Sequence, residues 1–294
     1  MSQRSYILNE TNWGAVREGA GANDEPRQRS RTEPAQASDS RPHRAHGEAA
    51  RTSDSPEFRP ARIAVLPWGA TEAHNYHLPY GTDNVQCDYV AAESARIAAA
   101  AGARVMVLPT VPFGVQTGQL DIPFCINLNP STQAAILADV ADSLAGQGVE
   151  ALVVLNGHGG NSFRQMIREL QPEIALFLCA VDWYRVEPQE PYFSDLGDHA
   201  GEMETSVMMY IAPDLVRPLS EAGDGHARPP RIGAFREGWA WAPRKWTDVT
   251  ADTGVGDPRA ASAEQGERYL ASVTAKIGTF LTELAAADFE DMYE

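Results

Sequence analysis

Beyond residue 60, short apolar runs alternate with stretches in which apolar side chains recur every three or four residues. Four apolar runs predict strands, at residues 62–70, 104–111, 150–157 and 174–184. Four periodic stretches predict helices, at residues 85–103, 131–148, 161–172 and 261–287. We expect Gly102 to end the first helix and Ser131 or Thr132 to cap the second. Strands that are apolar throughout and separated by helices indicate a three-layer α/β/α sandwich with a mostly parallel sheet.

Residues 19–59 break this pattern. The stretch is rich in Ala, Ser, Pro, Glu and Arg and has almost no aliphatic side chains, so it cannot bury enough surface to offset its ordering entropy. We interpret 1–294 as a single domain in which 19–59 is a disordered insertion. The apolar stretch at 5–16 is expected to pack on the main body, and His43 and His46 are not predicted to bind metal.

Composition and charge narrow the possible classes of protein. The chain of 294 residues is 43% hydrophobic, which is ample for a core, and no apolar run reaches the ~20 residues that cross a bilayer. Its start lacks the apolar core of a signal peptide, so we expect a cytoplasmic protein without a membrane partner. Three scattered cysteines argue against a disulfide framework. A net charge of −16 disfavours a nucleic-acid partner, because phosphate binding needs a basic face.

Polar motifs follow three of the four predicted strands. The motif "TEAHNYH" begins at residue 71, "NGHGGN" at 156 and "DWY" at 182. The carboxyl ends of parallel strands meet at one edge of a sheet, where ligands bind. We therefore expect these motifs to converge there, together with "GDHAGEMETS" at 197–206, which opens a further helix.

The residue types in these motifs are those of a metal site. Glu72 and His74 are two positions apart, so on an extended segment their side chains point to the same side. Asp83 returns from the far end of the loop, and His158 lies between two glycines that leave room for a ligand. Mixed histidine and carboxylate ligands suit zinc, manganese or iron. Two histidines and three carboxylates are too many for one catalytic zinc and are about right for two metals that share a carboxylate.

Each motif alone also has an ordinary interpretation. A histidine in a loop is often a surface residue, "NGHGGN" could be a tight turn, and acidic residues favour any helix start. His77 could merely hold its loop, and His226, in the Pro- and Gly-rich "GDGHARPP", is interpreted as incidental. The convergence of four of the seven histidines at one predicted sheet edge favours the metal site.

Four blocks of the sequence resemble the signature blocks of the creatininase (creatinine amidohydrolase) family. They read "PWGATEAHNYHLPYGTD", "NGHGGN", "DHAGEMETS" and "TGVGDPRAASAEQGERY". The resemblance implies a three-layer α/β/α fold, a homohexamer, a centre of two divalent metal ions per chain and hydrolysis of C–N amide bonds. Carried over by position, it makes Glu72, His74, Asp83 and His158 metal ligands, with Asp83 bridging.

The sequence departs from creatininase itself at one ligand. Creatininase reads "GHYEN" where this chain reads "GHGGN", so a ligating glutamate is replaced by Gly160. Members with the second form take the missing carboxylate from the "HAGxxET" block, which assigns Glu204 as the fifth ligand. In the same block His199 corresponds to a histidine that handles protons, and Glu202 is a candidate to orient it.

Two further departures concern the substrate. The stretch before "HAG" holds Tyr192 and Phe193 where creatininase places tryptophans, and Gln119 stands where the family pattern has a histidine. We therefore expect a metal-dependent amidohydrolase that acts on a small cyclic amide, formamide or peptide-like amide other than creatinine. A two-metal lyase or deaminase and a non-catalytic metal-binding homo-oligomer stay open. Five aromatic residues are candidates for pocket walls: Tyr76, Trp183, Phe193, Trp239 and Trp241.

Overall fold

A computed structural model describes residues 61–294 and contains a four-stranded sheet in which every pairing is parallel. The strands lie in the order β2-β1-β3-β4. Their bounds are β1 Ile63–Trp68, β2 Val105–Val107, β3 Ala151–Asn156 and β4 Phe177–Asp182. All four predicted strands are therefore present, and the second is shorter than its apolar run.

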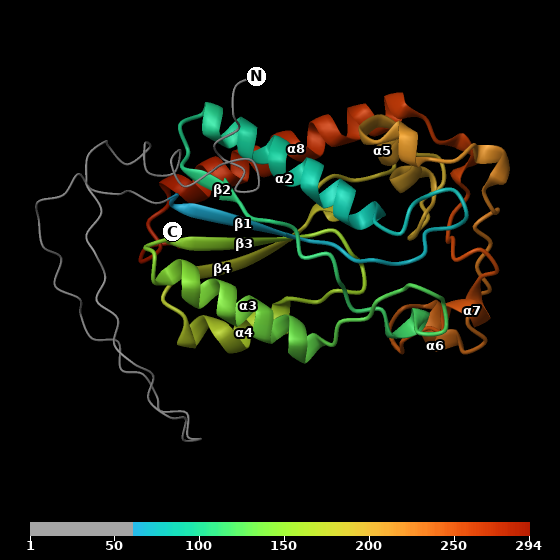
Figure 1. Ribbon diagram of the computed structural model, residues 1–294, viewed down its shortest axis with the longest axis horizontal. Coiled ribbons are helices and arrows are strands. Elements are labelled where there is room, and N and C mark those ends of the chain that lie inside the picture. Colours follow the sequence, from blue (N-terminus) through green and yellow to red (C-terminus); the bar gives the residue numbers. More distant parts are fainter. Residues whose placement is uncertain (1–60) are drawn as a thin grey trace, which may run out of the picture. The chain divides into compact units, whose positions relative to one another are not determined.

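Helices cover both faces of the sheet (Figure 1). The helices α2 (Thr82–Ala100), α5 (Glu202–Ile211) and α8 (Ala263–Ala286) lie on one face, and α3 (Pro130–Ala145) and α4 (Arg164–Leu170) lie on the other. Two short helices, α6 (Gly233–Arg236) and α7 (Trp246–Val249), lie beyond the carboxyl ends of the strands. This arrangement confirms the predicted three-layer sandwich. No helix between residues 61 and 294 combines the length and apolarity needed to cross a membrane.

Alternate residues of each central strand enter different halves of the core. In β1, Ile63 and Val65 pack with buried residues of α2 and α8, whereas Ala64 and Leu66 pack with residues of α3 and α4. Every residue of β1 and β3 is buried. Burial on both faces explains why these strands are apolar throughout instead of alternating between apolar and polar residues.

The helix ends agree with the sequence in part. Gly102 follows the end of α2 with a φ of 89°, a left-handed conformation that glycine adopts without steric cost. The predicted cap of α3 at Ser131 or Thr132 is wrong: the helix begins at Pro130, after Asn129. Proline suits the first helical position because its φ is already helical and its missing N–H would have had no partner there. The insertion predicted at 19–59, the stretch at 5–16 and both histidines of the insertion lie outside the described residues.

Candidate metal centre

Six of the seven predicted site residues come together at the carboxyl end of the sheet. Glu72 and His74 lie in the loop after β1, and Asp83 lies in the first turn of α2. His158 follows β3. His199 lies in the segment before α5, and Glu204 lies in the first turn of α5. Their ligand atoms form three overlapping groups, each with its atoms within 4.8 Å of one another. The groups are Glu72–His74–His199, Glu72–Asp83–His158 and His74–Asp83–Glu204.

Asp83 lies between two of the histidines. Its Oδ1 atom is 3.0 Å from His74 Nε2, and its Oδ2 atom is 3.1 Å from His158 Nδ1. Glu72 Oε1 lies 2.9 Å from His158 Nδ1 and 3.9 Å from His74 Nε2. The two carboxylates are almost fully buried, so their charges need close positive partners.

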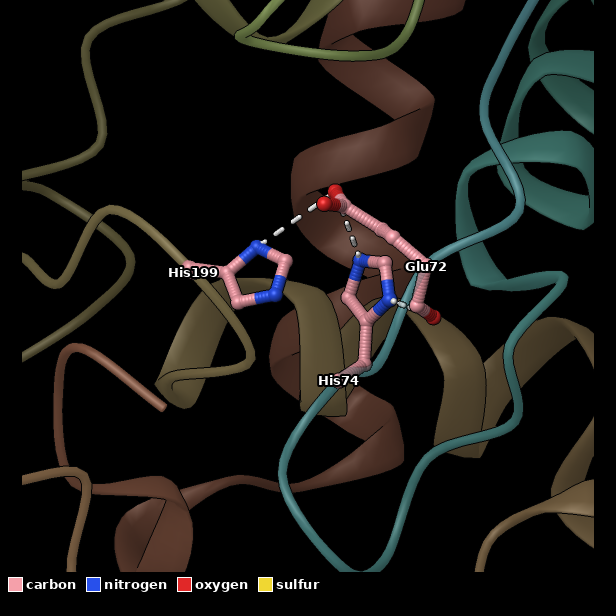
Figure 2. A group of neighbouring side chains, drawn as sticks. All are labelled: Glu72, His74 and His199. Atoms are coloured by element: carbon pink, nitrogen blue, oxygen red, sulfur yellow. Dashed lines mark hydrogen bonds and ion pairs between the residues drawn. The ribbon is translucent and has the colours of Figure 1, made fainter. Parts of the chain in front are cut away.

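His199 and Glu204 complete the cluster. His199 Nδ1 lies 3.7 Å from Glu72 Oε1, and Figure 2 shows this nitrogen directed at the glutamate beside the ring of His74. Glu204 Oε1 lies 3.9 Å from His74 Nε2, and its other oxygen accepts a hydrogen bond from the backbone N–H of Ala200. Helix α5 thus supplies a carboxylate on the side of His74.

Each of the three histidines binds a backbone carbonyl with its second ring nitrogen. His74 Nδ1 donates to the carbonyl of Glu72 (3.2 Å), His158 Nε2 to that of Val115 (3.0 Å) and His199 Nε2 to that of Ala73 (2.8 Å). The opposite nitrogen of each ring therefore presents its lone pair to a carboxylate oxygen. Because a lone pair and a carboxylate repel each other, a proton or a cation has to lie between them. Metal-ligating histidines show this pattern of an anchored N–H and a free nitrogen, so the donor set fits divalent ions.

The electrostatics of the cluster follow from burial and from close opposite charges. Burial alone would lower the pKa of His74, but the carboxylates of Asp83, Glu204 and Glu72 raise it to about 10. Against the same effect of burial, Glu72 and Asp83 raise the pKa of His158 well above its usual range. Burial opposes the ionisation of Glu72 and Asp83, yet the neighbouring histidines lower the pKa of both carboxyl groups. For Glu204 the effect of burial is larger than that of the histidines and raises its pKa. Without metal, protons join the imidazoles to the carboxylates, and a metal ion has to displace them.

Glu202 does not join this cluster. One of its oxygens accepts hydrogen bonds from Ser194 and from the backbone N–H of Asp195 (2.7 Å), and the other accepts one from Gln265 Nε2 (2.8 Å). Glu202 therefore joins the loop before α5 to α8. The carbonyl of Ala73 binds His199 Nε2, so the orienting contact for which Glu202 was a candidate comes from the backbone.

Of the two glycines expected to leave room beside His158, Gly159 has open space around it and Gly157 does not. A Cβ atom at Gly157 would lie 2.3 Å from Cys87 Sγ, and one at Gly160 would lie 2.2 Å from the carbonyl oxygen of Val115. Gly157 and Gly160 therefore allow close packing of the loop, whereas a Cβ atom at Gly159 would meet no other atom within 4 Å, as expected for a glycine that leaves room. Because position 160 has no space for a side chain, a carboxylate at this side of the cluster has to come from another element.

Sequence reasoning missed two residues that contact the cluster. Gln119 Nε2 donates a 2.6 Å hydrogen bond to Glu72 Oε2, and its Oε1 atom accepts one from the backbone N–H of Ala73 (3.2 Å). The ring of Trp246 lies 4.7 Å from that of His199. The only sequence signal for Gln119 was its place where the family pattern has a histidine, and Trp246 had none.

His77 has a fully buried position beside the cluster, and its Nε2 atom bonds to Thr205 Oγ1 at 2.8 Å. Burial and the neighbouring His74 lower the pKa of His77 to about 4. The bond links the loop after β1 to α5, as expected for a histidine that holds its loop.

A cavity of about 1680 Å³ reaches the cluster at Glu72 and His158. Of the five aromatic residues considered for its walls, only Trp241 lines it. Trp183 and Phe193 are buried in the core instead, and Tyr76 and Trp239 are largely exposed. The parallel α/β/α fold and a buried histidine–carboxylate cluster beside a cavity define the protein as a candidate metalloenzyme.

Comparison with known proteins gives its family. The family model for creatininase, described as creatinine amidohydrolase, matches residues 27–281. The mycofactocin precursor peptide peptidase of Mycolicibacterium smegmatis is 29% identical over 223 residues, which cover 72% of this chain and 81% of that protein. The creatinine amidohydrolase of Pseudomonas putida is 30% identical over 230 residues, which cover 71% of this chain and 84% of that protein. The chain therefore belongs to the creatininase family, as its motifs indicated, and is a hydrolase of carbon–nitrogen bonds.

Solved structures agree with this assignment. A crystal structure from Bacteroides fragilis, provisionally named creatinine amidohydrolase, matches with a TM-score of 0.75 and 46% identity over 79% of this chain and 92% of that one. Creatininases described as a zinc–zinc type and as a manganese form match with a TM-score of 0.62 each, at 26% and 25% identity. Each of these two covers 77% of this chain and 92% of the other.

Proposed function

We propose that this protein is a metal-dependent amidohydrolase that binds two divalent ions per chain. Glu72, Asp83 and His158 would hold one ion, and His74, Asp83 and Glu204 would hold the other. Zinc, manganese and iron all suit such a donor set, and similar creatininases are of zinc–zinc and manganese types.

The position of Asp83 carries this proposal. Each of its two oxygens faces the free nitrogen of a different histidine, at 3.0 and 3.1 Å. A carboxylate that served one ion would need only one of these histidines beside it. The arrangement is the one expected of a carboxylate shared by two ions, with a histidine and a glutamate for each.

Two divalent ions held by these residues would supply an activated water molecule and would polarise the carbonyl group of the scissile amide. We assign the proton transfer to His199. Its Nε2–H is fixed on the carbonyl of Ala73, so Nδ1 is the nitrogen that exchanges a proton, and it faces the cluster at Glu72. Protonation of the departing nitrogen is required because an amine anion is a very poor leaving group. The ring of Trp246 packs against His199 and helps to hold it in place.

We propose that the substrate is a small or peptide-like amide other than creatinine. Neither Tyr192 nor Phe193 lines the cavity, so these aromatic residues do not replace the tryptophans that creatininase places before its "HAG" block. The cavity, at about 1680 Å³, also exceeds the ~300–1,000 Å³ of a usual small-molecule pocket. Among the relatives, a peptide peptidase and a creatinine amidohydrolase both occur, which agrees with amide chemistry on substrates of different size.

The proposal is tested by metal content and by labelled oxygen. We expect elemental analysis to find close to two divalent ions per chain in wild type and close to one in Glu204→Gln. Hydrolysis of an amide in ¹⁸O water should place one label in the acid product. The matched control is Glu93→Gln, which removes a carboxylate from an exposed ion pair on α2 and should change neither result.

Two results would count against the proposal. A single ion that Glu204→Gln leaves in place means a mononuclear site and a different mechanism. Turnover without label in the product means a lyase. The homohexamer and the cytoplasmic location stay predictions, and light scattering on the purified protein tests the first.

A further inference from the structure

The cavity that reaches the candidate metal centre has a charge opposite to that of the protein. The whole chain has 24 basic and 40 acidic residues. In the cavity lining the order is reversed, with seven basic side chains and four acidic ones. One of the four acidic residues is Glu72, which belongs to the metal cluster. A cationic cavity in a protein of net charge −16 calls for a functional explanation.

Four of the basic residues have no ion pair with any residue between 61 and 294: Arg164, Arg168, Arg228 and Arg231. Arg164 and Arg168 are four positions apart on α4, where two like charges on one helix face destabilise the helix slightly. Arg231 comes from the segment before α6, far from them in sequence. The chain has carboxylates in excess, yet it places none within pairing distance of these guanidinium groups in the part that the structure describes.

The other three basic residues of the lining form ion pairs with its acidic residues. Arg244 Nη2 lies 2.8 Å from Asp198, Lys245 Nζ lies 3.5 Å from Asp248, and Arg185 Nη1 lies 3.9 Å from Asp182. Arg228 donates a hydrogen bond to the backbone carbonyl of Asp248, which holds its side chain but leaves its charge without an ion pair. The three ion pairs use all the acidic residues of the lining outside the metal cluster, so the surplus positive charge rests on the four arginines without an ion pair.

The basic residues of the cavity lining adjoin the candidate metal centre. Arg244 lies over the ring of Trp246, at 4.4 Å from the ring centroid, and the same ring packs against His199. On the other side, α4 follows directly on the loop that carries His158. A substrate in the cavity would therefore have its scissile amide at the metal cluster and its far end among guanidinium groups.

We propose that the natural substrate is an anionic amide, with a carboxylate or phosphate group that binds Arg164, Arg168 and Arg231. This inference rests on the proposed amidohydrolase function and adds the charge of the substrate to it. Guanidinium groups bind both anions through paired, charge-assisted hydrogen bonds, and they keep their charge across the physiological pH range.

The test uses two pairs of amides that differ in one charged group. The first pair is N-acetyl-β-alanine and N-propylacetamide, and the second is the phosphate ester of N-acetylethanolamine and N-acetylethanolamine itself. NMR titration of the zinc-loaded protein measures the affinity for each probe and detects released acetate in the same samples. We expect the anionic member of at least one pair to bind about tenfold more tightly than its neutral partner. The pair that shows the preference identifies the anion.

The variants assign the preference to the cavity. Arg164→Gln and Arg231→Gln, on separate segments, should each reduce it several-fold. Arg96→Gln removes the same charge from α2, on the opposite face of the sheet, and should leave it unchanged. Equal affinity for charged and neutral members, or an equal loss in the Arg96 variant, overturns the inference. If acetate is released equally from charged and neutral amides, the proposed amidohydrolase activity is supported and the anionic substrate is not. If the anionic member binds more tightly but no acetate is released, anion binding is supported and the result counts against the amidohydrolase activity.

Discussion

Gln119 should determine how tightly the centre holds metal, although it is not a ligand. Its amide nitrogen lies 2.6 Å from Glu72 Oε2, and its side chain is fully buried. The bond holds one carboxylate oxygen, so that the other, Oε1, points at His158. In Gln119→Leu the side chain keeps a similar volume but loses this donor.

The size of the effect follows from the kind of bond that is lost. A hydrogen bond to a charged group contributes about 1.5–3 kcal/mol, and a buried carboxylate without its donor also loses solvation. At about 1.4 kcal/mol per factor of ten, the apparent zinc affinity should fall by roughly tenfold to a hundredfold. Competition with a chromophoric chelator measures this affinity.

A nearby glutamine provides the control. Gln116 is also buried, but its amide donates to the backbone carbonyls of Thr71 and Ile126 and not to the carboxylate of Glu72. Gln116→Leu should therefore destabilise the fold without a selective loss of zinc. The reasoning fails if Gln119→Leu binds zinc as wild type does, or if both variants lose the same affinity. Thermal unfolding of the metal-free proteins separates a loss of stability from a loss of metal binding.

Three further outcomes follow from the structure. His199→Ala should retain the metal content of wild type but lose most of its hydrolysis of an amide. Its hydrolysis of an activated ester should fall less, because the leaving group of such an ester needs no proton. Equal losses on the two substrates would exclude His199 as the proton donor. Because the pKa of His74 is raised to about 10, its metal-free imidazole is protonated at neutral pH, so zinc affinity should rise with pH and binding should release protons. Calorimetry in two buffers of different ionisation enthalpy measures that release, and identical heats would contradict it. Thr205→Val removes the buried partner of His77 and should lower the free energy of unfolding by about 1–3 kcal/mol, whereas Thr282→Val, a change at a hydroxyl that bonds within α8, should have a much smaller effect in the same denaturation experiment.

The sequence by itself was sufficient for the architecture and for most of the candidate ligands. The apolar runs at β1 and β3 were recognisable because both faces of these strands are buried, and helical periodicity gave α2, α3 and α8. Glu72, His74, Asp83 and His158 could be selected because metal ligands are few in type and because the ends of parallel strands meet at one edge. The prediction was wrong at the start of α3, where Pro130 is the first helical residue, and for most of the aromatic residues considered for the cavity walls.

The tertiary structure decided how those residues are used. It showed that Asp83 lies between two histidines, that Glu202 bonds to α8 instead of His199, and that Gln119 holds Glu72. It also brought the arginines of α4 together with the segment around α6 at one cavity. Each of these facts depends on atoms that meet through space from positions far apart in the chain. Local periodicity and residue type predict the element on which a side chain lies, but its partner is known only when the packed elements fix both positions.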